Sequence, residues 1–500
     1  MPEPGHQHSL HRLHRIAVVT LLGFASGLPL ALTGQALQAW LSMEGLSLAT
    51  IGFLSLVGLP YTCKFLWAPL LDRFDELPLL GRRRGWLVLC QLLLAGTLLA
   101  LAATSPRDSI RAFALLAVLL AFFSATQDVV IDAYRTELLP APERGLGASL
   151  NVMGYRLAMI VSGGVALIWT DSAQGGGWTW PQVYRLMAAL LAGAALLSAI
   201  ALPAVPKRSE HEPRPPAGND LRGFAAVLLA VALGAWLSDR FAPAIAGLLA
   251  RALLAGTSLT PVLQQRWLDL LALLLGLAFT LPLAAWTARR ARFTTLLGGL
   301  ESYFATPGAA AFLLFIVLYK LGDAFAGSLM TPFLLQSMGY APAEVGVVNK
   351  VIGLWLTIGG ALLGGALMLR LGLWRSLLLF GVLQMASNLG FWWLAVAGKG
   401  AIGAGSGLLI PAFDWGFVSL AAPTPVDAGL LMVVAFENLS GGMGTAAFVA
   451  FLMSLCNQRF TATQYALLSA FASVGRVWVG PLAGVLAETI GWPVFFVLST

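Results

Sequence analysis

The chain has 500 residues, of which 58% are hydrophobic and only 11% are charged, and its mean hydropathy is +0.82. A soluble domain typically carries about 25% charged residues, so this composition excludes a protein whose whole surface faces water. The net charge of +7 does not indicate nucleic acid, because the basic residues fall in short clusters between apolar runs. We therefore predict an all-α, polytopic membrane protein in a lipid bilayer, with no nucleic-acid partner and no metal site.

The first part of the chain reads as a short basic tail, residues 1–15, followed by six apolar windows. A helix needs about 20 apolar residues to cross the hydrocarbon core of a bilayer. The first window resembles the front of a signal peptide, but it continues through Trp40 without a clear cleavage site, which predicts an uncleaved span. We expect residues 16–205 to form an N-terminal six-helix bundle, with spans near residues 16–40, 50–70, 86–104, 111–137, 145–169 and 183–203.

The middle of the chain, residues 206–308, combines a polar loop with two additional hydrophobic segments. The loop contains prolines and charges of both signs, which is typical of a connection between two halves. Charged residues interrupt the first hydrophobic segment, so two helices on the membrane surface are the alternative to two spans. We favour two spans, and the segments lie near residues 223–250 and 267–288.

The second half, residues 309–500, repeats the pattern of long apolar windows. A last apolar run begins at Trp492 and stops after nine residues, so we expect this final span to be truncated. Six spans, a hydrophilic loop and a second set of spans are the layout of the major facilitator fold, here with two six-helix bundles and two extra central segments. The windows of the second half lie near residues 309–336, 343–369, 373–397, 428–455 and 463–488.

The distribution of lysine and arginine predicts the orientation in the membrane. These residues are far more frequent in the segments on the side of the N-terminus than in the segments on the opposite side, which favours a cytoplasmic N-terminus. An even number of central spans keeps Arg370 and Arg375 on the cytoplasmic side as well, whereas a single central span would turn them outward.

The loop after the second window combines acid and base in a way that is typical of a conformational latch. An aspartate at this place accepts hydrogen bonds from the N-terminus of a neighbouring helix, and the arginines keep the loop on the cytoplasmic side. Near the cytoplasmic end of the fourth window, an acid and a base three residues apart predict an ion pair at the gate. The predicted gate and latch residues are Asp72, Arg73, Arg82, Arg83, Arg84, Asp132 and Arg135.

Several charged residues lie within the apolar windows. A charge near the bilayer centre costs about 2.5–3.5 kcal/mol on insertion scales, so these residues either pair with one another or line a wet cavity. Ion pairs that pin helices together are the simpler interpretation, but we favour a cavity for one set: Lys64, Asp128, Arg156, Lys320, Asp323, Lys350 and Glu437.

The sequence contains no catalytic constellation and no nucleotide-binding P-loop. We therefore predict a transporter and not an enzyme, with no cofactor, that either uses an ion gradient or facilitates diffusion. A buried carboxylate can take up a proton because desolvation disfavours its charged form. Asp128, Asp323 and Glu437 are the candidates for proton coupling, and the sequence does not choose among them.

Several longer strings resemble the AmpG family of bacterial muropeptide permeases. They are residues 22–30 (LGFASGLPL), 65–70 (FLWAPL), 154–157 (GYRL), 318–325 (LYKLGDAF), 346–350 (GVVNK) and 436–439 (FENL). The resemblance implies import of N-acetylglucosaminyl-1,6-anhydro-N-acetylmuramyl peptides across the inner membrane, driven by protons. It also implies roles in peptidoglycan recycling and in β-lactamase induction. Independently of the resemblance, we expect the chain to act as a monomer.

A cargo of this kind carries sugar rings and several carboxylates, so its site should contain cations, amides and aromatic side chains. We expect the substrate-binding residues to be Gln35, Lys64, Gln127, Tyr155, Arg156, Tyr319, Lys320, Asn349, Lys350 and Asn438. Two features depart from the family pattern. The additional spans lie in the middle of the chain instead of at its C-terminus, and an outer loop, residues 400–427, is long and rich in glycine and proline.

Three alternatives stay open. The first is a facilitator of another anionic solute, such as a coenzyme A thioester or a drug. The second is a polytopic glycan-processing enzyme, which we disfavour because the outer loops carry few acids, at scattered positions (Asp171, Asp414 and Asp427). The third is a receptor or scaffold that transports nothing.

Overall fold

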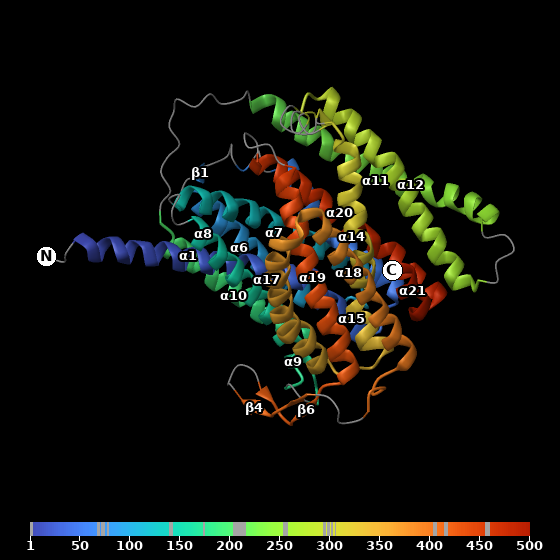
Figure 1. Ribbon diagram of the computed structural model, residues 1–500. Coiled ribbons are helices and arrows are strands. Elements are labelled where there is room, and N and C mark those ends of the chain that lie inside the picture. Colours follow the sequence, from blue (N-terminus) through green and yellow to red (C-terminus); the bar gives the residue numbers. More distant parts are fainter. Residues whose placement is uncertain are drawn as a thin grey trace.

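The computed structural model is a bundle of helices with a helical hairpin along one side (Figure 1). The predicted all-α membrane fold is confirmed: in the described part of the chain, eleven helices are long and apolar enough to cross a membrane, and both central helices are among them. The structure describes residues 4–67, 71, 76–77, 80–139, 144–173, 176–203, 217–253, 259–293, 297, 301, 304–305, 307–403, 408–414, 419–455 and 461–500.

The N-terminal half has helices in each of the six predicted windows, but three of the windows, the first, the second and the fifth, are not continuous α-helices. The second window is divided because Gly52, Gly58 and Pro60 weaken regular helix there. The helices are α1 (Pro4–Thr33), α2 (Gln35–Met43), α3 (Leu48–Phe53), η1 (Leu54–Gly58), α4 (Leu59–Cys63), η2 (Lys64–Leu66), α6 (Arg84–Ala102), α7 (Ile110–Leu138), α8 (Arg144–Met159), the π-helix η4 (Ile160–Val165), α9 (Ala166–Thr170) and α10 (Trp180–Ala201).

The C-terminal half repeats this arrangement, including π-helical turns, which here lie on either side of the connection between η5 and α16. Its helices are α14 (Ala309–Ser328), α15 (Met330–Pro332), η5 (Phe333–Ser337), α16 (Pro342–Gly346), η6 (Val347–Ile352), α17 (Gly353–Leu371), α18 (Leu373–Ala397), α19 (Ala428–Ser454), α20 (Thr461–Ile490) and α21 (Trp492–Ser499). The expected loop over residues 400–427 contains short antiparallel strands, in which β3 (Leu409–Ile410) pairs with β6 (Thr424–Pro425) and β4 (Phe413–Asp414) pairs with β5 (Ser419–Leu420). A third pair joins β1 (Glu76–Leu77) to β2 (Gly81–Arg82).

The two central segments form an antiparallel hairpin of α11 (Ala217–Leu253) and α12 (Pro261–Arg290), which lies along the upper right edge of the molecule (Figure 1). Small residues allow a close approach of the two helices. A Cβ atom added to Gly234 would lie 2.6 Å from Oγ1 of Thr280, and one added to Gly276 would lie 2.0 Å from Oγ of Ser238. The hairpin is therefore one packed unit.

The two halves meet at one end of the bundle. We call it the far end, because it lies opposite the loop between η2 and α6. The connections that follow α2, α9, η5 and α18 are at this end. Between described residues, the amide of Gln38 donates to the Ser328 carbonyl at 2.8 Å, and the amide of Gln336 donates to the Ser42 carbonyl at 3.0 Å. Helix α9 and the strands of the 409–425 region lie together at this end, at the bottom of Figure 1.

Candidate functional site

A polar cluster lies in the interior of the N-terminal half, around Asp128 of α7. The hydroxyl of Ser26, on α1, donates a hydrogen bond to the Asp128 carboxylate. The Lys64 ammonium, at the junction of α4 and η2, acts on the same carboxylate electrostatically. Tyr61 lies within electrostatic range of this carboxylate as well, and its hydroxyl is 3.4 Å from Oγ1 of Thr33. The cluster thus joins two predicted residues, Lys64 and Asp128, to three polar neighbours.

Two cations of this half lack a hydrogen bond or ion pair with a described residue, although Lys64 acts electrostatically on Asp128. Arg156, near the end of α8, is half-buried and makes no hydrogen bond or ion pair with another described residue. Lys64 is also half-buried, and its ammonium makes no hydrogen bond or ion pair with a described residue. Cations within apolar helices are costly unless they find an anion or water. Lys64 and Arg156 are therefore suited to bind an anionic solute.

The amide and tyrosine residues that we predicted in this half lie at different depths. Gln35 is half-buried at the beginning of α2, directly after the helix breaks at Gly34. Tyr155 is half-buried beside Arg156 on α8. Gln127 is completely buried in α7, and neither atom of its amide has a hydrogen-bond partner among the described residues. A buried amide without a partner is rare, and a solute or water could satisfy it.

The corresponding cation of the C-terminal half is engaged. The ammonium of Lys320, on α14, lies 3.4 Å from the Asp323 carboxylate, one helical turn away. It also lies 5.7 Å from the centre of the Phe448 ring, within the range of a cation–π contact. The ring of Tyr319 stacks on Phe448 at 5.3 Å, and its hydroxyl donates to the Leu377 carbonyl at 3.1 Å. Lys320 and Tyr319 therefore have partners of their own within this half.

A pocket of about 440 Å³ lies between α14 and α18, both of which belong to the C-terminal half. Tyr319, Asp323 and Asn388 provide polar groups, and Ser499 and Thr500 form another wall. Much of the remaining lining consists of exposed apolar side chains, among them Leu318, Trp374 and Leu378. The pocket therefore opens on the apolar surface of the bundle and does not join Asp323 to the cluster around Asp128.

The amide residues of the C-terminal half form helix-to-helix contacts. Asn438, on α19, donates to the Glu437 carboxylate at 2.7 Å and accepts from the Thr357 hydroxyl, on α17, at 2.9 Å. The amide nitrogen of Asn349 lies 3.6 Å from Sδ of Met330. The side chain of Lys350 lies outside the described part of the chain.

The predicted latch is described only in part. Asp72, Arg73 and the side chain of Arg82 lie outside the described residues. The guanidinium of Arg83 is buried, pairs with the Glu137 carboxylate of α7 at 2.9 Å and donates to the Leu71 carbonyl at 3.3 Å. These contacts attach the start of α6 to α7. Arg84 is half-buried, and its Nε has no hydrogen-bond partner among the described atoms.

The predicted gate pair is present in the structure. Asp132 and Arg135 form an ion pair at 3.1 Å on α7. Arg135 also donates to the side chain of Asn151, on α8, at 3.1 Å, and Asn151 donates to the Val19 carbonyl, on α1, at 3.1 Å. This chain of contacts connects three helices of the N-terminal half.

Sequence patterns pointed to none of the polar contacts at the far end, although a signal was present. Residues 45–52 (GLSLATIG) and 339–346 (GYAPAEVG) share the pattern G-x-x-x-A-x-x-G. In both copies the first glycine has a positive φ, 75° at Gly45 and 65° at Gly339. Each copy begins a helix that packs against the opposite half, so this repeat marks where the halves meet.

The chain was compared with known families and proteins. The family model of the Major Facilitator Superfamily matches residues 19–428. The chain is 42% identical over 485 residues to the anhydromuropeptide permease of Escherichia coli K12, which covers 97% of this chain and 77% of that protein. It is 32% identical over 486 residues to an uncharacterized protein of Haemophilus influenzae, covering 96% of this chain and 90% of the relative.

Solved structures show the same fold at low sequence identity. A peptide transporter of the POT family in complex with sulfate has a TM-score of 0.60 at 13% identity and covers 97% of this chain and 92% of its own. The D-xylose-proton symporter has a TM-score of 0.56 at 12% identity, covering 97% of this chain and 94% of its own. The family match and the helical architecture agree, and the chain is a multi-pass membrane transporter that belongs to the major facilitator superfamily.

Proposed function

We propose that this transporter imports anhydromuropeptides, the disaccharide peptides released from the bacterial cell wall, in symport with protons. The observation that carries the proposal is the 42% identity to the anhydromuropeptide permease of E. coli over 97% of this chain. The family model of the superfamily, in addition, matches residues 19–428. In this function the chain would return cell-wall fragments for peptidoglycan recycling and supply the signal for β-lactamase induction.

Two cations without an ion-pair partner among the described residues support an anionic cargo. Lys64 and Arg156 are half-buried within apolar helices, and neither makes an ion pair with a described residue. A guanidinium offers paired donors that match a carboxylate, whereas an ammonium acts as a point charge. We assign Arg156 and Lys64 to the carboxylates of the cargo, and Gln35, Gln127 and Tyr155 to its amides and sugars. Tyr319, Lys320, Asn349, Lys350 and Asn438 complete the proposed binding set from the other half.

We assign the proton to Asp128, with Asp323 and Glu437 as the remaining candidates. Asp128 accepts a hydrogen bond from Ser26 of α1 and interacts electrostatically with Lys64, the first residue of η2. Protonation would remove its charge and release Lys64 for the cargo, so proton binding and cargo binding would favour each other. The same neutralisation at Asp323 or Glu437 would act within the C-terminal half alone, on Lys320 or Asn438.

We propose that the protein lies in the inner membrane with its N-terminus in the cytoplasm, and that a single copy transports. The bias of lysine and arginine supports this orientation. The far end then faces outward, and the contacts between the halves at this end correspond to a state that is closed to the outside. Loading of the cargo requires that these contacts separate.

Uptake by the purified protein tests the function. Proteoliposomes with an alkaline interior should accumulate a labelled anhydromuropeptide, and a protonophore should abolish the accumulation. Liposomes that contain no protein provide the background. A lack of gradient-dependent uptake, or uptake of a coenzyme A thioester that anhydromuropeptides fail to inhibit, would contradict the proposal.

A further inference from the structure

Besides the contacts of Gln38 and Ser42 on α2 with the other half, two seams of similar construction join the halves at the far end. The first seam lies between α3 and η1 of the N-terminal half and α20 of the C-terminal half. The second lies between α16 of the C-terminal half and the η4–α9 segment of the N-terminal half. Since a transporter must expose its site to each side in turn, both seams have to open when cargo enters.

The same two features occur in both seams. In the first, a carboxylate oxygen of Glu488 accepts from the backbone N–H of Ala49 at 2.9 Å; in the second, Asp171 accepts from the N–H of Ala343 at 3.1 Å. Ala49 and Ala343 are each the second residue of their helix. Three residues later a glycine permits close packing: a Cβ atom added to Gly52 would lie 2.4 Å from the Gly480 carbonyl, and one added to Gly346 would lie 2.7 Å from the Gly164 carbonyl.

The seams differ in the cation that accompanies the acid. In the second seam, Lys399 belongs to the C-terminal half and pairs with Glu344 of that same half at 3.4 Å. Its ammonium lies 4.8 Å from the ring of Tyr340. Burial, together with the charges of Asp427 and Glu344, raises the pKa of Tyr340, so this ring stays neutral under the cation. Lys399 thus contacts residues of the C-terminal half and does not connect the two halves.

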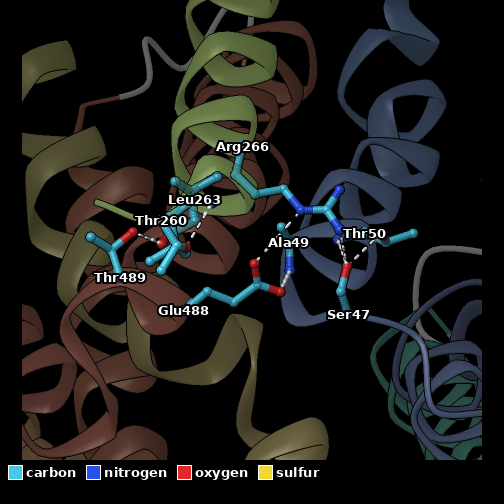
Figure 2. Close-up of polar contacts among 9 residues, drawn as sticks. Ser47, Ala49, Thr50, Thr260, Leu263, Arg266, Glu488 and Thr489 are labelled. Atoms are coloured by element: carbon cyan, nitrogen blue, oxygen red, sulfur yellow. Dashed lines mark hydrogen bonds and ion pairs between the residues drawn. The ribbon is translucent and has the colours of Figure 1, made fainter. Parts of the chain in front are cut away.

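In the first seam the cation comes from the central hairpin. Arg266, near the start of α12, donates to the Ser47 hydroxyl at 2.9 Å and lies 3.7 Å from the second carboxylate oxygen of Glu488. Figure 2 shows this side chain extending between Ser47 of the N-terminal half and Glu488 of the C-terminal half. The exposed fractions of the two charged side chains are 27% and 17%, so water screens the pair only in part.

Apolar packing holds α12 over the same seam. Leu270 lies in one buried cluster with Ala49 of the N-terminal half and Val485 of the C-terminal half, and Trp267 packs against it. One side chain and one apolar cluster of the hairpin therefore contact both halves at once. Separation of the halves would break the contact of Arg266 with at least one of them.

We propose that Arg266 is a positioning residue of the transport cycle, through which the central hairpin holds the first seam closed. The hairpin contacts both halves, which must separate during transport, and it thereby stabilises the closed far end relative to the open one. We call this set of contacts the strap. Loss of the Arg266 contacts shifts the population toward the open far end without altering the cargo site. This role holds for whichever solute the protein carries.

Accessibility of buried cysteines tests the strap without any cargo. Two reporters are introduced singly after replacement of Cys63, Cys90 and Cys456: Ser55→Cys, whose parent side chain meets Gly480 in the first seam, and Leu167→Cys, whose parent side chain meets Gly346 in the second. The measurement is the rate of reaction with a maleimide added from the far side. Because each half moves as a packed body, opening of the far end should expose both reporters together.

The strap predicts that Arg266→Gln raises the labelling rate at both reporters by the same factor, about threefold to tenfold for a partly screened charged contact. Arg266→Lys, which keeps the charge, should stay close to the parent rate. Arg251→Gln removes an exposed arginine from the same hairpin, at the C-terminal end of α11, and should change nothing.

Unchanged labelling in Arg266→Gln, or an increase confined to Ser55→Cys, would overturn the proposal, because local loosening of α12 affects only the first seam. If Arg266→Gln does not fold, Ser47→Ala removes the contact from the other side and should raise both rates by a smaller common factor. An unaltered rate in Ser47→Ala would then contradict the strap. The labelling rates do not depend on the cargo. A lack of anhydromuropeptide uptake would therefore contradict the proposed function without contradicting the strap.

Discussion

The interiors of the two halves carry similar residue types but use them differently. In the N-terminal half, Arg156 and Lys64 make no ion pair with a described residue, and Asp128 is held by the hydroxyl of Ser26. In the C-terminal half, Lys320 already has a carboxylate partner at 3.4 Å. A cation with an internal partner has less to gain from a cargo carboxylate than a cation without one. We therefore propose that the charge of the cargo is recognised mainly in the N-terminal half.

The contacts of the C-terminal half suggest a structural contribution. Asn438 connects α19 to α17 through Thr357, and Tyr319 connects α14 to α18 through the Leu377 carbonyl. Hydrogen bonds between helices keep a half rigid as it moves. In this proposal one half binds the charge of the cargo, and the other provides a rigid surface against which the cargo is enclosed.

The largest effect is expected at Arg156. Arg156→Gln should lower anhydromuropeptide uptake by about 10- to 100-fold, because a hydrogen bond to a charged group contributes roughly 1.5–3 kcal/mol. The uptake rate of Arg156→Lys should lie between those of the wild type and Arg156→Gln, since lysine keeps the charge but lacks the paired donors. Initial uptake rates in proteoliposomes measure the effect. Arg185→Gln, at an exposed position of α10, is the matched control and should transport normally, whereas normal uptake by Arg156→Gln would place recognition elsewhere.

The next effect concerns energy coupling at Asp128. A difference of one pH unit corresponds to 1.36 kcal/mol and drives about tenfold accumulation per proton. Asp128→Asn should lose this accumulation, because its side chain no longer gains or loses a proton, yet it should still exchange labelled for unlabelled cargo. Asp323→Asn and Glu437→Gln should keep the gradient response. If Glu437→Gln or Asp323→Asn loses accumulation while Asp128→Asn retains it, the proton belongs to the C-terminal half.

The smallest effect is expected for the ion pair of Lys320 and Asp323. Their side chains are 16% and 38% exposed, so the pair contributes only on the order of 1 kcal/mol. Lys320→Gln should therefore lower uptake by less than about tenfold. The double variant with Asp323→Asn should do no worse than the single one, because it leaves no unpaired charge. A loss at Lys320 as large as the loss at Arg156 would remove the distinction between the halves.

Composition and spacing predicted much of the fold. The apolar windows were sufficient to locate the spans, because the bilayer imposes one length on every crossing helix. Spacing also placed Lys320 and Asp323 on one helical face, as well as Asp132 and Arg135, and both pairs are present. The interruption of the second window into α3, η1, α4 and η2 was not predicted, because the weakening effect of its glycines and proline depends on the neighbouring helices.

Contacts between distant segments were beyond prediction from sequence. Ser26 and Asp128 are 102 positions apart, and Ala49 and Glu488 are 439 positions apart. Local periodicity carries no information on such pairs, since the packing of whole helices decides them. The same limit explains Lys320: its spacing predicted a shared face with Asp323, but only the tertiary structure shows that Lys320 is engaged while Arg156 is not.

The central claim is that cations of the N-terminal half recognise the carboxylates of an anhydromuropeptide. The most direct measurement is competition against labelled anhydromuropeptide uptake in wild-type proteoliposomes, with two unlabelled competitors that differ only in amidation of the peptide carboxylates. The account predicts that the natural cargo competes well and that the amidated analogue competes poorly, while in Arg156→Gln the two differ much less. Equal competition by both compounds in the wild-type protein would contradict it.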